Sequence, residues 1–245
     1  MTDLKQHWES VYGRNEPTAV SWFQPEAKLS LELIRSWVPD RDEPILDVGG
    51  GASTLVDDLL ADGYRRVTVV ELAAAALAVT RARLGERAAG AVSLIEADVL
   101  TAELPAGSVG CWHDRAVFHF LTDPADQDRC LAQVRRIVRP GGAVLIATFA
   151  ADGPTRCSGL PVARYSPEEL QAVFGPGFEL LDTRREVQTT PTGATQAFTY
   201  ALFRWSGARG GVHRMVVIRG DWLGSSSFIA VGTGSSPRSP TSRTR

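Results

Sequence analysis

Acidic residues recur at the ends of four apolar stretches of this sequence, and three consecutive glycines follow the first of them. The residues concerned are Asp47, Gly49, Gly50, Gly51, Glu71, Asp98 and Asp114. In an open α/β sheet, ligands bind outside the carboxyl ends of the strands, so these side chains are expected to meet at one edge of the sheet. Glycines at that edge let the backbone turn sharply into a helix and approach a ligand closely. The pattern predicts a ligand site built from carboxylates and main-chain groups.

The residue types around the glycines narrow the class of ligand. The dinucleotide fingerprint GxGxxG is incomplete, because Thr54 stands at the third glycine position. Asp47 would also serve a pyrophosphate poorly. S-adenosylmethionine (SAM) has no phosphate, and its ammonium, sulfonium, ribose hydroxyls and adenine amine all suit carboxylate partners. We expect Glu71 to accept hydrogen bonds from the ribose, and Asp98 to accept one from the adenine amine while Val99 contacts the ring. A nicotinamide-dependent oxidoreductase stays as an alternative, since an acid at position 71 is common to both classes.

Hydrophobic periodicity and end signals predict the elements that must position these residues. Apolar stretches predict strands at residues 44–48, 66–72, 91–99, 108–114, 143–150, 178–187 and 196–205. Periodicity and capping residues, among them Asp123 and the Ser166–Glu169 pair, predict helices at 3–14, 25–37, 52–63, 73–88, 124–138 and 165–175. The RPGG sequence at 139–142 predicts a type II turn. This order is typical of one doubly wound α/β domain over residues 1–205 that ends in an antiparallel hairpin.

The overall composition indicates an ordinary globular protein. Of the 245 residues, 44% are hydrophobic and 22% are charged, and no apolar run is long enough to span a bilayer. The N-terminus lacks the basic start and apolar core of a signal peptide. The cysteines Cys111, Cys130 and Cys157 are widely spaced and odd in number, which favours a reducing compartment, and we expect the cytoplasm. No cluster of cysteine and histidine predicts a metal site.

Charge is distributed unevenly along the chain. Residues 206–245 contain six arginines and one acid, whereas residues 1–205 contain 20 basic and 27 acidic residues. The excess of acids in the larger part argues against general binding to nucleic acid. The last 40 residues are rich in serine and glycine and lack a sustained period, so we expect a poorly ordered tail.

The ordered set of motifs resembles a class I SAM-dependent methyltransferase. The resemblance covers roughly residues 5–205 and rests on DVGGGAS, Glu71, EADV, HDRAVFHF, RPGG and the terminal hairpin. HWESVY and SWFQP are similar to segments of the subgroup that includes the citrate-synthase and elongation-factor lysine methyltransferases and their bacterial relatives. The resemblance implies a Rossmann-like sheet, mostly parallel, with strand order 3-2-1-4-5-7-6 and helices on both faces. It also implies a helical lid at 1–40 and a SAM-binding domain at 41–205, and the tail at 206–245 has no counterpart in the resemblance.

The same resemblance implies which residues form the site. The cofactor-binding set comprises Trp8, Tyr12, Trp22, Asp47, Gly49, Gly50, Gly51, Glu71, Leu72, Asp98, Val99 and Asp114. Phe23 is expected to be a packing residue, and Trp37 is expected to lie in the core. The lysine methyltransferases have a second acid five residues after the one that matches Asp114, where this chain has His119. This departure leaves both a protein side chain and a small molecule open as acceptors.

Methyl transfer from a sulfonium is an in-line displacement, in which the enzyme positions a nucleophile and excludes water. A base is needed only if the acceptor arrives protonated. We predict His119 as that base and Asp114 as a second catalytic residue, with His113 as the alternative base; a structural role stays open for either histidine. Arg115 could bind an anionic acceptor or form a structural ion pair. A catalytically silent SAM-binding protein is a further alternative to the enzyme.

Overall fold

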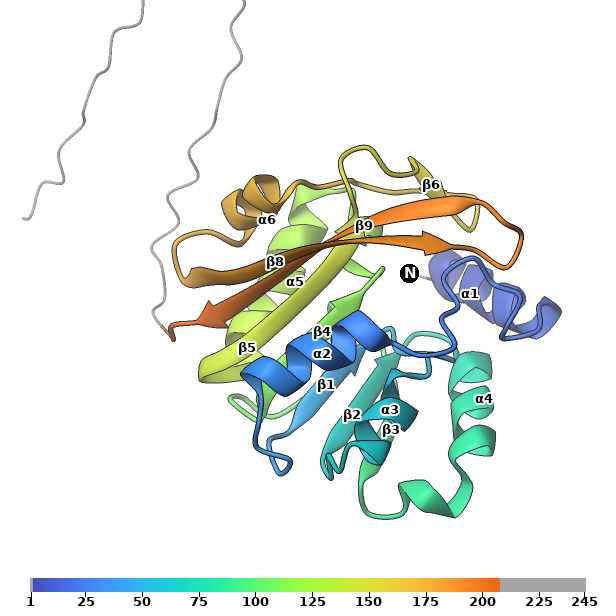
Figure 1. Ribbon diagram of the computed structural model, residues 1–245, viewed down its shortest axis with the longest axis horizontal. Coiled ribbons are helices and arrows are strands. Elements are labelled where there is room, and N and C mark those ends of the chain that lie inside the picture. Colours follow the sequence, from blue (N-terminus) through green and yellow to red (C-terminus); the bar gives the residue numbers. More distant parts are fainter. Residues whose placement is uncertain (1, 208–245) are drawn as a thin grey trace, which may run out of the picture. The chain divides into compact units, whose positions relative to one another are not determined.

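Seven strands form one sheet in the computed structural model, which describes residues 2–207 (Figure 1). They are β1 (Ile45–Val48), β2 (Val67–Glu71), β3 (Val92–Glu96), β4 (Val109–Arg115), β5 (Val138–Phe149), β8 (Phe178–Thr189) and β9 (Thr195–Trp205). Their order is β3-β2-β1-β4-β5-β9-β8, and β1 to β5 pair in parallel. β9 lies antiparallel between β5 and β8. The predicted fold class and strand order are confirmed, while the predicted tail lies outside the described residues apart from its first two.

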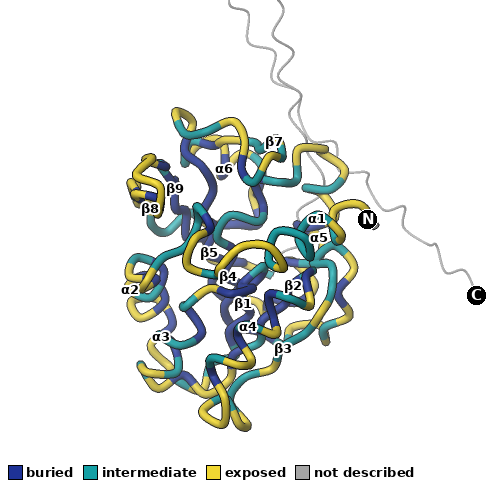
Figure 2. The backbone as a smooth tube through the Cα atoms, turned by 90° about the vertical axis from the view of Figure 1, so that its right-hand side faces the viewer, coloured by how far each residue is buried: buried dark blue, intermediate teal, exposed yellow. Residues whose placement is uncertain are grey.

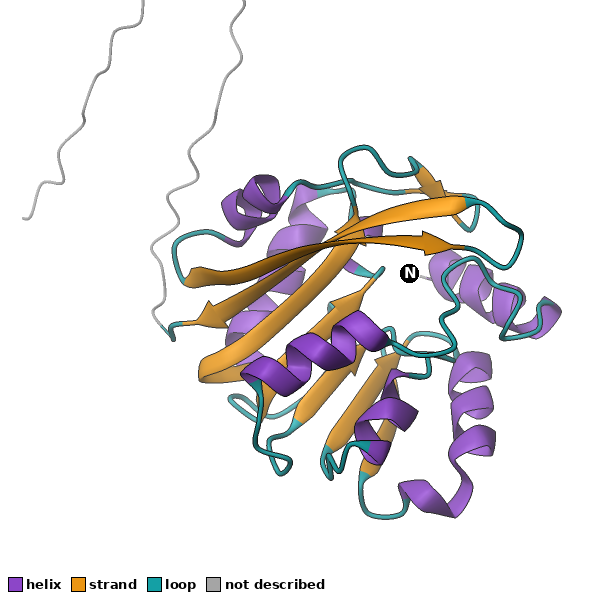
Figure 3. Cartoon of the chain, viewed as in Figure 1, coloured by secondary structure: helices purple, strands orange, loops and turns teal. Residues whose placement is uncertain are grey.

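Helices cover both faces of the sheet (Figure 3). They are α1 (Thr2–Arg14), α2 (Lys28–Trp37), α3 (Leu55–Ala61), α4 (Ala74–Leu84), α5 (Pro124–Ile137) and α6 (Pro167–Phe174), with short 3-10 helices η1 (Gly85–Ala88) and η2 (Phe118–Phe120). The apolar faces of α2, α3 and α4 pack into one core cluster, and those of α5 and α6 pack into the other. None of the helices between residues 2 and 207 is long and apolar enough to cross a membrane.

The central strands are buried on both sides, as Figure 2 shows, so their alternating side chains enter different cores. In β4, Cys111 belongs to the cluster under α2 and α3, and Trp112 belongs to the cluster under α5 and α6. The same alternation turns His113 toward α2 and Asp114 toward the α5 face. His113 and Asp114 are adjacent in β4 and therefore lie on opposite faces of the sheet.

The predicted helix starts are confirmed where a side chain caps them. The Asp123 carboxylate accepts a hydrogen bond from Ala125 N at 2.9 Å, and Pro124 occupies the first turn of α5. At α6, Ser166 Oγ accepts from Glu169 N and Glu169 accepts from Ser166 N, which completes a capping box. These bonds lie within a few residues of each other, so the sequence alone encodes them.

Other expectations differ from the structure in part. The buried stripe of α2 runs through Ser30, Leu33, Ile34 and then Val38, so Trp37 points outward and is 37% exposed rather than in the core. The RPGG sequence lies within the bounds of β5, where the ladder with β4 is interrupted between the Val138–Val109 and Ala143–Cys111 pairs. Gly141 has φ of 80° there, as the second central position of the predicted type II turn requires. A small hairpin of β6 (Arg156–Cys157) and β7 (Leu160–Pro161) was not predicted.

Candidate functional site

A cavity of about 470 Å³ opens at the carboxyl ends of β1, β2, β3 and β4. The predicted site residues on its wall are Trp8, Tyr12, Trp22, Gly49, Glu71, Leu72, Asp98 and Val99. The wall also includes Leu4, Leu100, Arg115, Phe120, Leu121, Asp126, Arg129 and Cys157, none of which was predicted to bind the cofactor. Most of these additions come from α1, α5 and the turn after β4, which sequence spacing did not connect with the strand ends.

The glycines after β1 are required by close packing on both sides of the turn. Gly49 and Gly51 have φ of 62° and 42°, in the left-handed region that side chains disfavour. A Cβ on Gly49 would overlap the Val117 side chain. A Cβ on Gly51 would lie 2.9 Å from Glu71 Oε2 and 3.0 Å from the Tyr12 hydroxyl. The turn therefore brings the main chain of β1 against the β2 carboxylate and against α1.

The two predicted acids on the wall, Glu71 and Asp98, differ in their surroundings. Glu71 is 6% exposed, and its Oε1 accepts a hydrogen bond from Ala73 N at 2.9 Å. Burial raises the pKa of Glu71 to about 7. Asp98 is half-buried, and its Oδ1 accepts from Leu100 N at 2.8 Å, which fixes the turn after β3. Both carboxylates are held by main-chain donors beside the cavity.

Asp47 faces a smaller recess beside the main cavity. This recess, of about 50 Å³, shares Tyr12, Trp22 and Gly49 with the cavity wall and also includes Gly50. Asp47 is 2% exposed, and its Oδ1 lies 2.7 Å from His113 Nδ1. Its Oδ2 has no hydrogen-bond partner among the described residues. The recess thus presents an unpaired carboxylate oxygen within a buried space.

Asp114 and His119 do not lie on the wall of the cavity. Asp114 is fully buried; its Oδ1 accepts from Val117 N and Phe118 N at 3.0 and 3.1 Å, and burial raises its pKa to about 7. His119 is also fully buried, its Nδ1 accepts from Phe149 N at 3.3 Å, and burial lowers its pKa to about 3. Both side chains hold the turn after β4. Their catalytic roles stay a prediction, and the geometry supports structural ones.

Aromatic side chains close one side of the cavity. Trp8 packs edge to face on Trp22 and on Phe120, with ring centroids 5.7 and 5.2 Å apart, and Tyr12 packs on Trp22 at 6.1 Å. Trp8, Tyr12 and Trp22 are half-buried. Phe120 was not singled out from the sequence, because only its position in the turn after β4 brings it to α1.

α1 is attached to the body through polar contacts. The Glu9 carboxylate accepts hydrogen bonds from Ala74 N at 2.7 Å and Ala75 N at 3.1 Å, at the N-terminus of α4. An acid is favoured there by the unpaired N–H groups and the helix dipole. Lys5 pairs with Glu96 at the end of β3. These contacts hold the aromatic face of α1 over the strand ends.

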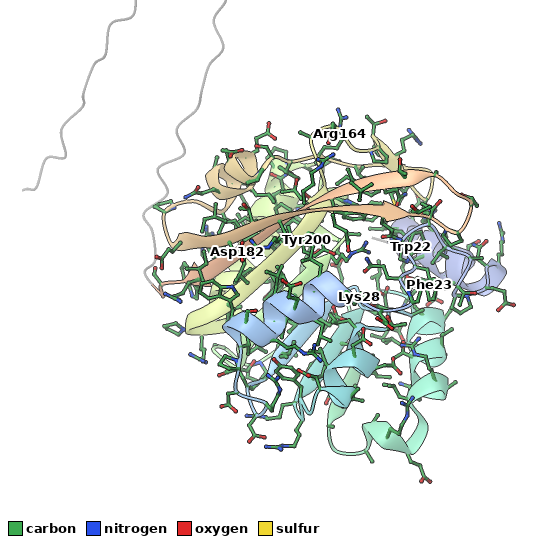
Figure 4. The ribbon with its side chains drawn as sticks, in the orientation of Figure 1. Trp22, Phe23, Lys28, Arg164, Asp182 and Tyr200 are labelled. Atoms are coloured by element: carbon green, nitrogen blue, oxygen red, sulfur yellow. The ribbon has the colours of Figure 1, made fainter. Side chains whose placement is uncertain are left out.

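Arg115 ties the segment between α1 and α2 to the terminal hairpin. It donates to the Tyr200 hydroxyl at 2.9 Å and to Trp22 O at 3.3 Å, and it pairs with Glu186 at 3.5 Å. Its guanidinium lies over the Phe198 ring at 4.2 Å. Figure 4 shows Trp22 on the N-terminal segment and Tyr200 on β9. Of the two roles expected for Arg115, the geometry supports the structural ion pair.

Gln188 of β8 completes this attachment. Its side chain accepts from Arg115 and donates to Ser21 O at 3.2 Å and to Phe23 O at 2.8 Å. Phe23 therefore contributes a main-chain acceptor to the attachment, while its ring is half-buried. The segment that carries Trp22 is fixed by residues more than 90 positions away in sequence.

Within residues 2–207, no group of three or more histidine, cysteine, aspartate or glutamate side chains is arranged to hold a metal ion. The chemistry of the cavity wall is set by carboxylates, main-chain groups and aromatic rings.

Residues 45–142 match a family described as a methyltransferase domain. The chain is 31% identical over 122 residues to the ubiquinone/menaquinone biosynthesis C-methyltransferase UbiE of Methylobacterium nodulans, a match that covers 48% of this chain and 47% of that protein. It is 24% identical over 201 residues to EEF1A lysine methyltransferase 2 of Danio rerio, covering 76% of this chain and 78% of that protein. The chain thus spans about half the length of the first relative and about three quarters of the second.

A solved structure with the same fold is Burkholderia thailandensis 1,6-didemethyltoxoflavin-N1-methyltransferase with bound 1,6-didemethyltoxoflavin and S-adenosylhomocysteine. The TM-score is 0.62 at 23% identity, and the match covers 84% of this chain and 88% of that chain. At this identity the likeness shows the fold alone.

Proposed function

We propose that this chain is a SAM-dependent methyltransferase, because residues 45–142 match a methyltransferase domain, and that it transfers a methyl group from SAM to an acceptor bound beside its N-terminal aromatic residues. The observation that carries the proposal is the meeting of Gly49, Glu71 and Asp98 from three adjacent strand ends on the wall of one cavity. A second ligand class, the nicotinamide dinucleotides, is disfavoured by the unpaired Asp47 oxygen beside the glycine turn.

The residues of the cavity fit the chemical groups of SAM. Glu71 would accept hydrogen bonds from the two ribose hydroxyls, and Asp98 from the adenine amine, with Leu72 and Val99 against the apolar faces. The Asp47 Oδ2 atom would pair with the ammonium group, which fits a recess of about 50 Å³ that holds an unpaired carboxylate oxygen. The glycine turn brings main-chain groups of Gly49 to the cavity wall, beside the proposed position of the methionine part. No phosphate-binding group is needed.

SAM, when bound, supplies a methyl group on a positively charged sulfur. The chain's own contribution is to orient the acceptor and exclude water, and the faces of Trp8 and Trp22 would favour a cationic centre beside them. Among the described residues of the wall there is no histidine and no lysine. This favours an acceptor whose nucleophilic atom already carries a free electron pair at neutral pH.

The acceptor is proposed to be a small molecule or a protein side chain. The similar proteins include a methyltransferase of ubiquinone/menaquinone biosynthesis and a methyltransferase named for a lysine of EEF1A. We place the reaction in the cytoplasm, since Cys111, Cys130 and Cys157 are all buried and free of disulfides.

Calorimetry with SAM, S-adenosylhomocysteine and NAD tests the proposal. We expect both SAM and its demethylated product to bind, and NAD not to bind. Binding of NAD in preference to SAM would overturn the assignment in favour of an oxidoreductase. Release of S-adenosylhomocysteine in the presence of a candidate acceptor, measured by chromatography, would then separate an enzyme from a silent SAM-binding protein.

Affinity for SAM should fall as the pH drops below about 7. Because burial raises the pKa of Glu71 to about 7, much of this group is protonated at neutral pH before the ligand binds. Hydrogen bonds from the ribose hydroxyls of SAM favour the ionised form of Glu71, so binding of SAM releases the proton from this side chain. The dissociation constant of SAM should therefore rise by up to about tenfold for each pH unit below that pKa. The measurement is a calorimetric titration series from about pH 6 to pH 8 in buffers of different ionisation enthalpy.

Glu71→Gln is the matched control for this pH series, because the amide keeps the size of the side chain and does not titrate. Its affinity should vary less with pH than that of the unmodified protein. Equal pH dependence in both proteins would show that another group titrates on binding and that Glu71 does not contact the ribose.

A further inference from the structure

A buried chain of three polar side chains runs from α2 to the glycine turn. Ser30 Oγ of α2 lies 2.9 Å from His113 Nε2 of β4, and His113 Nδ1 lies 2.7 Å from Asp47 Oδ1 of β1. The three residues are 1%, 3% and 2% exposed. Asp47 and His113 are paired neighbours in the parallel register of β1 and β4, so their side chains leave the sheet on the same face.

The groups that donate and accept hydrogen bonds among Ser30, His113 and Asp47 follow from the chemistry of these side chains. The Asp47 carboxylate can only accept, so His113 Nδ1 carries a proton and donates to it. In the neutral ring, Nε2 then accepts from the Ser30 hydroxyl. Both ring nitrogens are thus engaged, and His113 does not lie on the wall of the main cavity. The ring is poorly placed to exchange a proton with an acceptor there, although the sequence left it as an alternative base.

The two oxygens of Asp47 have different environments. Oδ1 is held by His113, whereas Oδ2 is buried without a partner among the described residues, and Asp47 is one of the residues that line the recess beside the main cavity. A Cβ on Gly50 would collide with Oδ2, so the carboxylate occupies space that only a glycine leaves open. Burying an unpaired carboxylate oxygen costs free energy unless a partner arrives. The hydrogen bond to Oδ1 fixes the orientation of the carboxylate and leaves Oδ2 as the oxygen without a partner among the described residues.

We infer that His113 is a positioning residue for cofactor binding, held in turn by Ser30. It fixes the Asp47 carboxylate in one orientation, with Oδ2 ready for the ammonium group of SAM. Because Ser30 belongs to α2, the same hydrogen bonds couple the position of that helix to the methionine end of the site. The inference rests on the proposed function and adds to it two residues, Ser30 and His113, which line the recess together with Asp47 and act through its carboxylate.

The test compares two ligands that differ in one group: S-adenosylhomocysteine and its analogue without the α-amino group. Binding of each is measured by calorimetry to the full chain and to the variants His113→Leu, His113→Asn and Ser30→Ala. For S-adenosylhomocysteine we expect His113→Leu to raise the dissociation constant about tenfold or more, as for a lost hydrogen bond to a charged group. For the analogue we expect a change of less than about twofold, because the group that Asp47 would bind is missing.

The two milder variants separate positioning from folding. His113→Asn keeps an N–H donor on the Asp47 side but cannot reach Ser30, so it should restore much of the affinity that His113→Leu loses. Ser30→Ala removes only the outer bond and should raise the dissociation constant of S-adenosylhomocysteine by about threefold. Cys111→Ala is the matched control, since Cys111 is a buried residue on the same face of β4 and is paired with Ile45 rather than with Asp47 in the register of β1 and β4. Cys111→Ala should change the dissociation constants of the two ligands by the same factor.

Equal losses for both ligands in the His113 and Ser30 variants would overturn the positioning role and leave the proposed function standing. Failure of the unmodified chain to bind S-adenosylhomocysteine would remove the proposed function and this inference with it. If His113→Leu does not fold, the test uses His113→Asn and Ser30→Ala instead. For each of these variants, the change in the dissociation constant of S-adenosylhomocysteine is compared with the change for the analogue without the α-amino group.

Discussion

Glu71→Ala should raise the dissociation constant for SAM by about 5- to 150-fold, which corresponds to about 1–3 kcal/mol of lost hydrogen bonding in a buried site. Glu71 is 6% exposed at the end of β2, where water cannot easily replace the carboxylate as a partner of the ribose hydroxyls. Asp98→Ala should act in the same direction but less strongly, because Asp98 is half-buried and already accepts from Leu100 N. Calorimetry with purified variants measures both effects.

Glu179→Ala is a suitable control for these substitutions. Glu179 lies on β8, at the edge of the sheet far from β2 in strand order, and its ion pair with Arg204 is largely exposed. Its removal should leave the affinity for SAM unchanged. Unchanged affinity in Glu71→Ala and Asp98→Ala as well would remove the basis for the cofactor assignment. Melting curves of the ligand-free variants show whether a loss of affinity reflects a loss of folding.

Trp8→Ala should raise the dissociation constant for SAM by about 5- to 30-fold. The expected loss, about 1–2 kcal/mol, combines the cation–π attraction of a desolvated ring for a sulfonium with the entry of water where the ring stood. Trp8 packs on Trp22 and Phe120 on the cavity wall, so its removal opens the closed side of the site. Calorimetry measures the affinity, and tryptophan fluorescence should change on addition of SAM.

Trp37→Ala provides the comparison within the same chain. Trp37 is 37% exposed at the end of α2, and it does not line the cavity. Its replacement should affect neither the affinity nor the fluorescence change on binding, whereas Trp22→Phe should diminish that change. Indistinguishable affinities of Trp8→Ala and Trp37→Ala would show that α1 is a packing element and not part of a lid over the cofactor.

The sequence by itself determined the fold class, the strand order through its resemblance, and part of the cavity wall, including Gly49, Glu71 and Asp98. Strand ends, glycine turns and helix caps depend on neighbours a few residues apart. Asp123 and Ser166 cap their helices for this reason. Gly49, Glu71 and Asp98 were also predictable, because the carboxyl ends of parallel strands necessarily meet at one edge of the sheet.

Only the tertiary structure decided which side chains reach the cavity and which face away from it. His113 and Asp114 are adjacent in sequence, but the alternation of β4 sends one to Ser30 and the other to the turn that ends in His119. Arg115 donates a hydrogen bond to Tyr200, a residue 85 positions later, because β4, β5 and β9 are neighbours in the sheet. Such contacts depend on the register and packing of distant segments, which no local pattern encodes. The sequence therefore predicted the acids of the site, while the folded chain decided which of them, Glu71 and Asp98, lie on the cavity wall and which, Asp114, does not.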